Sequence, residues 1–261
     1  MRKKEIIQFI VEWLRTYSET SHTQGFVIGI SGGIDSALTS TLCALTGKPV
    51  IVVNMPIRQN KSELDRGLEH IEWLKVNYPN VRSEVVNLTG IFEKVESDLP
   101  NNIQDFLTMA NTRSRLRMIT LYAFAGHHKM LVAGTGNKVE DFGIGFFTKH
   151  GDGGVDISPI ADLMKSEVYA LAAELGIVKS ILNARPTDGL FADDRTDEDQ
   201  IGATYDELEW AMKAIENKVN ESSFSERQKE VMQIYTQRNK ANKHKIEAIP
   251  VCKIPNDLKQ G

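Results

Sequence analysis

Apolar residues along this chain gather in short stretches that are separated by longer segments with a helical period. Four stretches are candidate strands, at Gly25–Ile30, Val50–Asn54, Val81–Leu88 and Met130–Ala133. Strands that are largely apolar, rather than apolar at alternate positions, are typical of parallel sheets buried on both faces. Because a helical segment lies between successive strands, the pattern predicts an α/β fold with helices covering both faces of the sheet.

The segments between the strands carry apolar residues on one side of a helix. At the start of the chain, Ile6, Ile10 and Leu14 repeat with the helical period. Residues 134–154 and 184–200 lack such a period and are predicted to be irregular, and loops this long are usually functional or mobile. The other predicted helices span Ser36–Thr46, Ser62–Val76, Ile91–Leu99, Ile103–His127, Lys165–Leu175, Tyr205–Glu216 and Ser225–Lys243.

In sheets of this kind, ligands bind beyond the carboxyl ends of the strands. Here these ends follow Ile30, Asn54 and Ala133. We therefore expect the chemistry of this protein to lie in the segments that leave the sheet at those three points.

Composition and charge exclude several classes of protein. The chain has 261 residues, with 31 Lys and Arg against 35 Asp and Glu, so its net charge is −4. This balance argues against a general nucleic-acid-binding protein. No stretch approaches the roughly 18 consecutive apolar residues that a membrane-spanning helix needs. The two cysteines, Cys43 and Cys252, are far apart and form no CxxC motif, which favours a reducing, cytoplasmic setting.

The segment Gly29–Ser36, with the sequence GISGGIDS, has the character of a phosphate-binding loop. It joins a predicted strand to a predicted helix, and its adjacent glycines allow the backbone to approach an anion closely. It lacks the lysine of a Walker A loop and carries Asp35 instead. A carboxylate beside phosphates requires a cation between them, so we expect Mg²⁺. The alternative is a Gly-Gly turn in which Asp35 caps a helix.

The SGGxDS pattern of this loop resembles the N-type ATP pyrophosphatases. These enzymes hold pyrophosphate as the leaving group while a substrate oxygen attacks the α-phosphorus of ATP. A nitrogen or sulfur nucleophile then displaces AMP. The loop alone does not indicate which substrate is adenylated.

Four further segments contain candidate substrate-binding residues. Two of them are placed by the predicted elements. Gly134–Glu140 comes directly after the fourth predicted strand, and Asn111–Met118 lies on a predicted helix. The segment Gly145–Asp156 mixes glycines, aromatic residues, a lysine and carboxylates, which suits a loop that becomes ordered over a polar ligand. The fourth segment is the pair His244 and Lys245, which taken alone would favour a charged surface.

Several of these residues also allow a purely structural interpretation. On a helix, Asn111 and Arg115 share one face, whereas Arg113 and Arg117 share a nearly opposite face. For Arg113 and Arg117 we favour structural salt bridges. Glu140 could complete a Mg²⁺ shell with Asp35, or it could be a solvated loop acid. The apolar residues that follow Arg117 predict a deeply buried helix, with a subunit interface as one way to bury it.

Together, the segments SGGIDS, NTRSRLRM, GTGNKVE and GFFTKHGDGGVD closely resemble the ammonia-dependent NAD synthetases, from about Ile6 to Pro250. The GFFTKxGDGGxD segment is much more specific than the phosphate loop. The resemblance implies the conversion of deamido-NAD, ATP and ammonia into NAD, AMP and pyrophosphate through an adenylated intermediate, as the final step of NAD biosynthesis. We accordingly expect an α/β fold with a doubly wound, mostly parallel five-stranded sheet, arranged as a Rossmann-like three-layer sandwich.

The resemblance also assigns roles to residues that match the family motifs. The ATP site would consist of Gly29, Ile30, Ser31, Gly32, Gly33, Ile34, Asp35, Ser36, Thr135, Lys165 and Thr187. Deamido-NAD would contact Arg115, Lys149, Asp156, His244 and Lys245. Asp35 and Glu140 would bind Mg²⁺, and ATP would serve as co-substrate. The catalytic residues would be Asp35, Lys165 and Asp152, of which Asp152 would orient or deprotonate ammonia.

One local departure from the family pattern concerns the segment after the fourth strand. Many bacterial members have Asp-His after the Gly-Thr pair, whereas this chain has Gly136 and Asn137. The spacing from Glu140 to the GFFTK segment is one residue longer than in those members. The resemblance therefore leaves the geometry around Glu140 open.

The resemblance further implies a cytoplasmic homodimer whose interface helps to form the deamido-NAD site. We expect residues 1–261 to form a single NAD synthetase domain without an amidase domain, because the phosphate loop arrives by Ser31. No nucleic-acid or membrane partner is expected. Two other readings stay open: another adenylating enzyme such as a tRNA-modifying one, which would bind tRNA, and a regulatory nucleotide-binding module, which would form no AMP.

Overall fold

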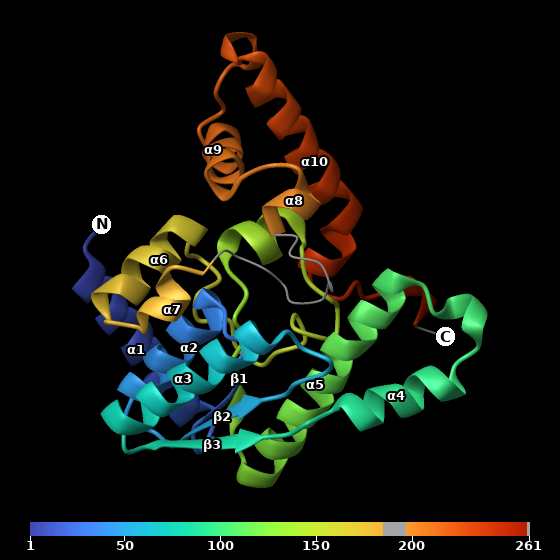
Figure 1. The fold of residues 1–261 in the computed structure, drawn as a ribbon. Coiled ribbons are helices and arrows are strands. Elements are labelled where there is room, and N and C mark those ends of the chain that lie inside the picture. The colour runs from blue at the N-terminus through green and yellow to red at the C-terminus, as the bar shows by residue number, and fades with distance from the viewer. Residues whose placement is uncertain (185–196, 260–261) are drawn as a thin grey trace.

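The centre of the molecule is a parallel sheet with helices on both sides (Figure 1). The computed structural model describes residues 1–184 and 197–259. Within them the sheet has four strands in the order β3-β2-β1-β4, and all three neighbouring pairs are parallel. The strands are β1 (Phe26–Gly29), β2 (Val50–Asn54), β3 (Val81–Val85) and β4 (Leu131–Val132).

The expectation of five strands is wrong for the described residues. The segment that runs beside β4 forms only an isolated parallel bridge, between Ala133 and Ile157. Hydrogen bonds from Gly134 N to Ile157 O (2.8 Å) and from Asp156 N to Val132 O (3.1 Å) hold this segment in place. Because β4 is only two residues long before the chain turns away, a ladder cannot extend along it.

Each face of the sheet is covered by its own set of helices, because successive strand residues point to opposite sides. Phe26 and Ile28 belong to a core cluster with residues of α1 (Lys3–Thr20), α2 (Ile34–Leu45) and α6 (Lys165–Glu174). Val27 and Val53 belong to a separate cluster on the other face, with residues of α4 (Thr89–Asp98) and α5 (Phe106–His128). The chain therefore forms three layers, as the sequence predicts.

Helix boundaries follow from capping residues that are visible in the sequence. The Asn60 side chain accepts a hydrogen bond from Ser62 N at the start of α3 (Lys61–Asn77). Thr204 and Ser225 each form a capping box at the starts of α9 (Tyr205–Glu216) and α10 (Glu226–Ile246). The remaining elements are η1 (Asn101–Ile103), η2 (Lys138–Ile144), α7 (Lys179–Leu182), α8 (Asp197–Ile201), η3 (Glu221–Ser223) and η4 (Asn256–Leu258).

Helices α9 and α10 form a hairpin that projects from the carboxyl-end side of the sheet (Figure 1). Its apolar side contains Leu208, Met212 and Val231, which cluster with Val139 and Ile144 of η2. The hairpin is therefore anchored to the segment that follows β4. This contact brings residues from the end of the chain to the edge of the sheet where ligands bind in such folds.

Two segments that the sequence predicts to be irregular contain helices. Residues 138–144 form the π-helix η2, and residues 197–201 form α8. Helix α5 starts at Phe106, three residues later than predicted, because the Asp105 side chain caps it by accepting a hydrogen bond from Thr108 N (3.0 Å).

The apolar stretch of α5 is not buried on all sides. Met118, Leu121 and Ala125 pack against the sheet, whereas Ile119 is 67% exposed and Tyr122 is 39% exposed. One face of α5 thus completes the core while the other presents apolar side chains on the surface.

Among the described helices, none combines the length and the apolar character that crossing a membrane requires.

The core cluster around α2 supports the strand that precedes the phosphate loop. Leu42 is fully buried there, so Leu42→Ala should lower the free energy of unfolding by about 2–5 kcal/mol through lost burial and a cavity. Urea denaturation measures this change. Val76, which is 83% exposed on α3, provides the control: Val76→Ala should stay within about 0.5 kcal/mol of the parent protein. Equal effects of the two substitutions would contradict this assignment of the core.

Candidate active site

A cavity of about 630 Å³ opens at the carboxyl ends of the strands. Residues of the β1–α2 loop, α5, the loop after β4, α6 and α10 line it together. The strand order β3-β2-β1-β4 explains this position. From β1 the chain adds β2 and β3 on one side, and it then returns to add β4 on the other side of β1. Ligands in open parallel sheets bind at such a reversal point.

The β1–α2 loop is held open by its own serines and by its closeness to α3. Ser36 Oγ donates to Gly33 O (3.0 Å) and lies 3.1 Å from Ser31 Oγ. Gly32 has φ +90°, and a Cβ there would lie 2.4 Å from the carbonyl oxygen of Glu63. Only glycine satisfies both the conformation and the space. The free N–H groups at the start of α2 then face the cavity, which is the geometry of an anion site.

The side chain of Lys165 lies at the centre of the site, between two carboxylates from different elements. Its Nζ is 2.6 Å from Asp35 Oδ2 and 2.8 Å from Glu140 Oε1. The three residues come from α6, α2 and η2, which are far apart in the sequence. Lys165 is 3% exposed, so this charge needs both partners to be stable in the interior. The sequence-based prediction placed these three residues in one site, and the structure brings them into contact.

Burial and mutual charge shift the pKa of each group in this cluster. Burial raises the pKa of Asp35, and repulsion from Glu140 adds to this, while Lys165 opposes it. Burial acts to raise the pKa of Glu140 as well, but the ammonium of Lys165 and the hydroxyl of Tyr205 lower it overall. Burial would lower the pKa of Lys165, but the two carboxylates raise it well above its ordinary value. The lysine therefore stays protonated and keeps the carboxylates together.

Asn137 connects this cluster to the helix that carries Glu140. Its Nδ2 donates to Asp35 Oδ1 (3.0 Å), and its Oδ1 accepts from the N–H groups of Val139 and Glu140 (3.0 Å each). The side chain is fully buried. Asn137 is one of the residues in which the sequence departs from many bacterial members, and that departure was the available signal for its role.

Tyr205 is a site residue that the sequence analysis did not identify. Its hydroxyl donates a short hydrogen bond to Glu140 Oε1 and lies 3.2 Å from Asp197 Oδ2, while the Lys165 ammonium sits 4.9 Å from the centre of its ring. It is the first residue of α9, in the segment DEDQIGATYDEL that resembles the family. Through Tyr205 the C-terminal hairpin contacts the catalytic cluster.

The segment that carries Glu140 forms a π-helix. Residues 138–144 adopt this widened turn, and Gly145 ends it with φ +64°. Asp141 lies close to Gly136, where a Cβ would be 1.9 Å from Asp141 Oδ2. The expected extra residue after Glu140 stays a prediction. Burial raises the pKa of Asp141, and the nearby Asp152, Glu140 and Asp35 add to it.

Asp152 is fixed beside α5 by three hydrogen bonds. Its Oδ1 accepts from Ser114 Oγ (2.6 Å) and from Thr148 N (3.1 Å), and its backbone N–H donates to Ser114 Oγ (2.9 Å). Asp152 also lines the cavity. A carboxylate in this position can orient a polar nucleophile or accept a proton from it.

Basic side chains from three distant segments gather in the same cavity. Arg115 Nε donates to Lys149 O (3.2 Å), and Lys149 Nζ donates to His244 O (2.7 Å). Lys245 Nζ donates to Phe147 O (2.7 Å) and lies 4.8 Å from the centre of the Phe147 ring. All four basic residues line the cavity. His244 and Lys245, which alone resemble ordinary surface charge, thus belong to a cluster suited to an anionic ligand.

The other predicted site residues differ in where they lie. Thr135 lines the cavity beside Gly134. Asp156 lies outside it and accepts hydrogen bonds from Val132 N (2.8 Å) and Tyr122 Oη (3.0 Å), so a substrate contact for Asp156 stays a prediction. Thr187 falls outside the described residues.

Arg113 and Arg117, which the helical spacing places on the other face of α5 from Arg115, differ in their surroundings. The Arg113 guanidinium lies 5.7 Å from the centre of the Phe92 ring. Arg117 Nε donates to Met55 O (3.0 Å), and Arg117 lines the cavity. Within the described part of the chain, Arg117 has no ion pair, which contradicts the structural salt bridge favoured for it.

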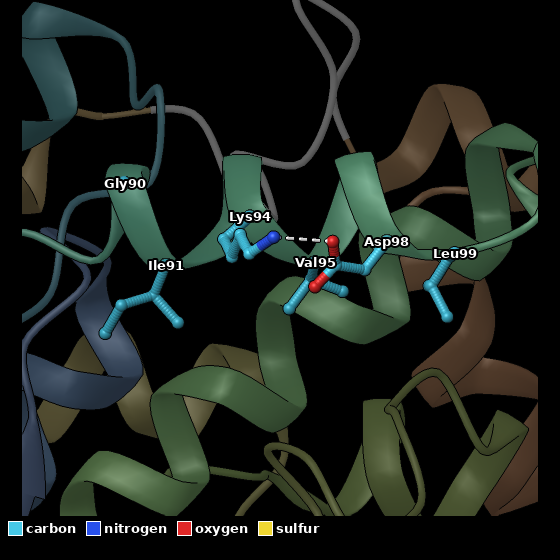
Figure 2. Close-up of a pocket in the computed structure, with 6 residues that line it drawn as sticks. All are labelled: Gly90, Ile91, Lys94, Val95, Asp98 and Leu99. Carbon is cyan, nitrogen blue, oxygen red and sulfur yellow. Dashed lines mark hydrogen bonds and ion pairs between the residues drawn. The ribbon is translucent and has the colours of Figure 1, made fainter.

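A second cavity, of about 450 Å³, runs along the outer side of α4 (Figure 2). Apolar side chains, Ile91, Val95 and Leu99, form most of its wall. Its charged groups, Lys94 and Asp98, pair with each other at 2.7 Å. This cavity therefore presents apolar surface and offers no reactive group.

A profile of the NAD synthase family matches residues 6–249. The chain belongs to the NAD synthase family.

Individual relatives cover most of the chain. The NH(3)-dependent NAD(+) synthetase of Alkaliphilus metalliredigens is 40% identical over 211 residues, which are 78% of this chain and 83% of the relative. That of Methanosarcina mazei is 35% identical over 250 residues, covering 93% and 95%. The solved structure of the NMN synthetase of Francisella tularensis is similar with a TM-score of 0.86 and 30% identity, covering 97% of this chain and 100% of that one.

The donor set of this NAD synthase family member is compatible with a magnesium ion. Asp35 and Glu140 each direct one oxygen at the same ammonium, so the two carboxylates converge on a single cation. No group of three or more His, Cys, Asp or Glu residues that could hold a metal occurs in residues 1–184 and 197–259. Two carboxylates with the other positions left for phosphates and water are what Mg²⁺ commonly takes, whereas a structural zinc site would need more protein ligands.

The phosphate loop gives a direct test of this site. Gly32→Ala should weaken ATP binding at least about tenfold, because the methyl group would meet the Glu63 carbonyl oxygen at 2.4 Å and the backbone has φ +90°. Calorimetric titration with ATP measures the affinity. Gly90→Ala is the matched control, because a Cβ at Gly90 meets nothing within 4 Å. Undiminished ATP affinity in Gly32→Ala would show that this loop does not bind the phosphates.

Proposed function

We propose that this chain is an ammonia-dependent NAD synthetase, which uses ATP to amidate deamido-NAD to NAD as the last step of NAD biosynthesis. The observation that carries the proposal is the buried contact of Lys165 with Asp35 and Glu140 beside a lysine-free phosphate loop. The membership of the chain in the NAD synthase family and the identity with NH(3)-dependent relatives support it.

The ATP end of the site is formed by the loop Gly29–Ser36, Thr135 and Lys165, with Thr187 as a further ATP contact. The loop N–H groups hold the phosphates, and the Lys165 ammonium offsets charge that develops on the leaving pyrophosphate. Asp35 and Glu140 would hold Mg²⁺, and the positive charge that the ion supplies would offset the repulsion between these carboxylates and the phosphates. Because the carboxyl oxygen of deamido-NAD attacks the α-phosphorus, the products of this step are an acyl adenylate and pyrophosphate.

The acyl substrate occupies the basic end of the cavity. Arg115, Lys149, His244 and Lys245 contact the phosphates and ribose hydroxyls of deamido-NAD, with Asp156 as a further contact. Arg115, Lys149 and Lys245 already donate hydrogen bonds to the backbone carbonyls of Lys149, His244 and Phe147, so their positions are set before the substrate arrives. Preorganised donors of this kind favour an anionic ligand because they need little rearrangement on binding.

Ammonia enters near Asp152 and attacks the acyl carbon, which expels AMP. At neutral pH free ammonia is mostly ammonium, so a carboxylate must take up a proton during the reaction. The Ser114 hydroxyl and Thr148 N–H fix the Asp152 carboxylate beside the cavity. Asp152 therefore orients the nucleophile and accepts its proton.

We infer that residues 1–261 work as a single NAD synthetase domain supplied with free ammonia, in the cytoplasm and as a homodimer. The apolar outer face of α5 supports the dimer: Ile119 is 67% exposed and Tyr122 is 39% exposed, and the apolar cavity of α4 lies in the same layer. Exposed apolar groups of this size on one side of a molecule commonly mark an interface. Arg115 lies on the same helix, so a partner seated there would border the acyl site.

A second candidate substrate is the mononucleotide of nicotinic acid. The specific observation in its favour is the close similarity to the NMN synthetase of Francisella tularensis, with a TM-score of 0.86 over nearly the whole chain. Both substrates present the same pyridinium carboxylate to be amidated, and they differ only in the adenylyl half. Activity assays with each acid in turn decide between them.

The function is tested by incubating the protein with ATP, ammonium, Mg²⁺ and either acid. AMP and pyrophosphate should form together with the amide product. Asp35→Asn should lower this rate by about 10²–10³ through loss of a preorganised charged group, while circular dichroism shows an intact fold. Asp162→Asn, whose carboxylate is almost fully exposed, should keep the parent rate. Formation of ADP instead of AMP, or wild-type turnover of Asp35→Asn, would contradict the proposal.

The homodimer is tested by changing the outer face of α5. Ile119→Glu should shift the protein from dimer to monomer in sedimentation velocity runs, because a carboxylate would be buried without a partner at the interface. Phe9 is 74% exposed on α1, and Phe9→Glu should leave the dimer intact. A parent protein that sediments as a monomer at micromolar concentration would exclude this arrangement.

A further inference from the structure

Arg117 lies between the phosphate loop and the residues around Asp152. It is on α5, and its Nε donates to the carbonyl oxygen of Met55 just after β2 (3.0 Å). The Met55 side chain in turn reaches Gly29, where the Cβ position lies 3.2 Å from Met55 Cε. Arg117, Met55 and Gly29 all line the cavity. Arg117 thus borders the cavity beside the strand end that leads into the phosphate loop.

The terminal nitrogens of this guanidinium are not used by the protein. Across residues 1–184 and 197–259, neither Nη atom of Arg117 has a hydrogen-bond partner or an ion pair, and the bond to Met55 engages Nε alone. A guanidinium presents its remaining N–H donors as a planar fork that matches two oxygens of a carboxylate or a phosphate. The unused donors belong to a side chain that lines the cavity.

Among residues 1–184 and 197–259, no ion pair neutralises the charge of Arg117. Burial lowers the pKa of Arg117 to about 10, and the neighbouring Arg113 adds to this, while Glu63 and Asp152 oppose it from a distance. The side chain therefore stays charged at neutral pH although its surroundings disfavour the charge. An anion that enters the cavity would offset the cost of burying this positive charge, because a buried cation is stabilised most by a close partner of opposite charge.

We propose that Arg117 is a substrate-binding residue that grips an oxyanion of a reactant through its Nη atoms, rather than a structural residue. The oxyanion is either the carboxylate of the acyl substrate or a phosphate of ATP, which share the same two-oxygen chemistry. The proposal rests on the function proposed above for its choice of ligands. Bridging the two reactants at this point would orient the attacking oxygen toward phosphorus.

Binding measurements that need no turnover separate the two sources. Calorimetry gives the affinities of the parent protein and of Arg117→Gln for ATP, deamido-NAD and NAD, the last of which differs from deamido-NAD in carrying an uncharged amide. If Arg117 binds the carboxylate, the ratio of the affinity for deamido-NAD to the affinity for NAD should fall at least about tenfold in Arg117→Gln. The affinity for ATP should then stay unchanged. If Arg117 binds a phosphate of ATP, ATP affinity should fall by a similar factor while the acid-to-amide preference is kept.

Two further variants control for effects on the fold. Arg15→Gln removes an arginine that likewise donates from Nε to a backbone carbonyl, Thr46 O (3.3 Å), but lies outside the cavity, so it should change no affinity. Arg117→Lys keeps the charge but not the fork, and should reduce the same affinity by a smaller factor. If Arg117→Gln does not fold, Arg117→Lys decides the question by the same two measurements.

The outcome that overturns the proposal is a folded Arg117 variant with parent ATP affinity and parent preference for the acid over the amide. In that case the side chain only supports the backbone at Met55. A parent protein that forms no AMP would overturn the proposed function instead. The affinities of the Arg117 variants for ATP, deamido-NAD and NAD would still decide the role of Arg117.

Discussion

The contact of one buried ammonium with two carboxylates organises this protein. Lys165 on α6, Asp35 on α2 and Glu140 on η2 meet although they come from three separate stretches of the chain. None of these charges would be stable alone at that depth, so each element is held in register by the need to neutralise the others. Tyr205 extends the contact to α9, which joins the C-terminal hairpin to the same point.

One cavity brings acidic and basic side chains from distant segments together. Asp35, Glu140 and Lys165 lie beside the loop Gly29–Ser36, and Arg115, Lys149 and Lys245 also line the cavity. A cation is compatible with the carboxylates, and an anionic ligand is compatible with the basic side chains.

Gly136 and Asn137 stand where many bacterial family members have Asp-His, and the structure shows what Asn137 contacts. Asn137 caps η2 and also holds Asp35, so the amide connects the phosphate loop to the helix that carries Glu140. The segment 138–144 is a π-helix, and in it Glu140 faces Lys165.

Much of this molecule follows from its sequence. Apolar periodicity predicted the strands β1, β2 and β4 and the helices around them, since burial on one or two faces leaves a repeating pattern. The context of a strand, two glycines and a helix was enough to predict a phosphate loop carrying Asp35. The resemblance to a family supplied Glu140, Lys149 and Lys165 as further site residues.

Other features were decided only by the tertiary structure. The π-helix η2 has no apolar period of its own. The number of strands depended on how far the segment around Ile157 could pair beside β4. The contacts of Tyr205 and Arg117 join residues that are distant in the sequence. Local pattern encodes which face of an element is buried, because burial acts on each residue separately. Which charges meet is set by packing between elements.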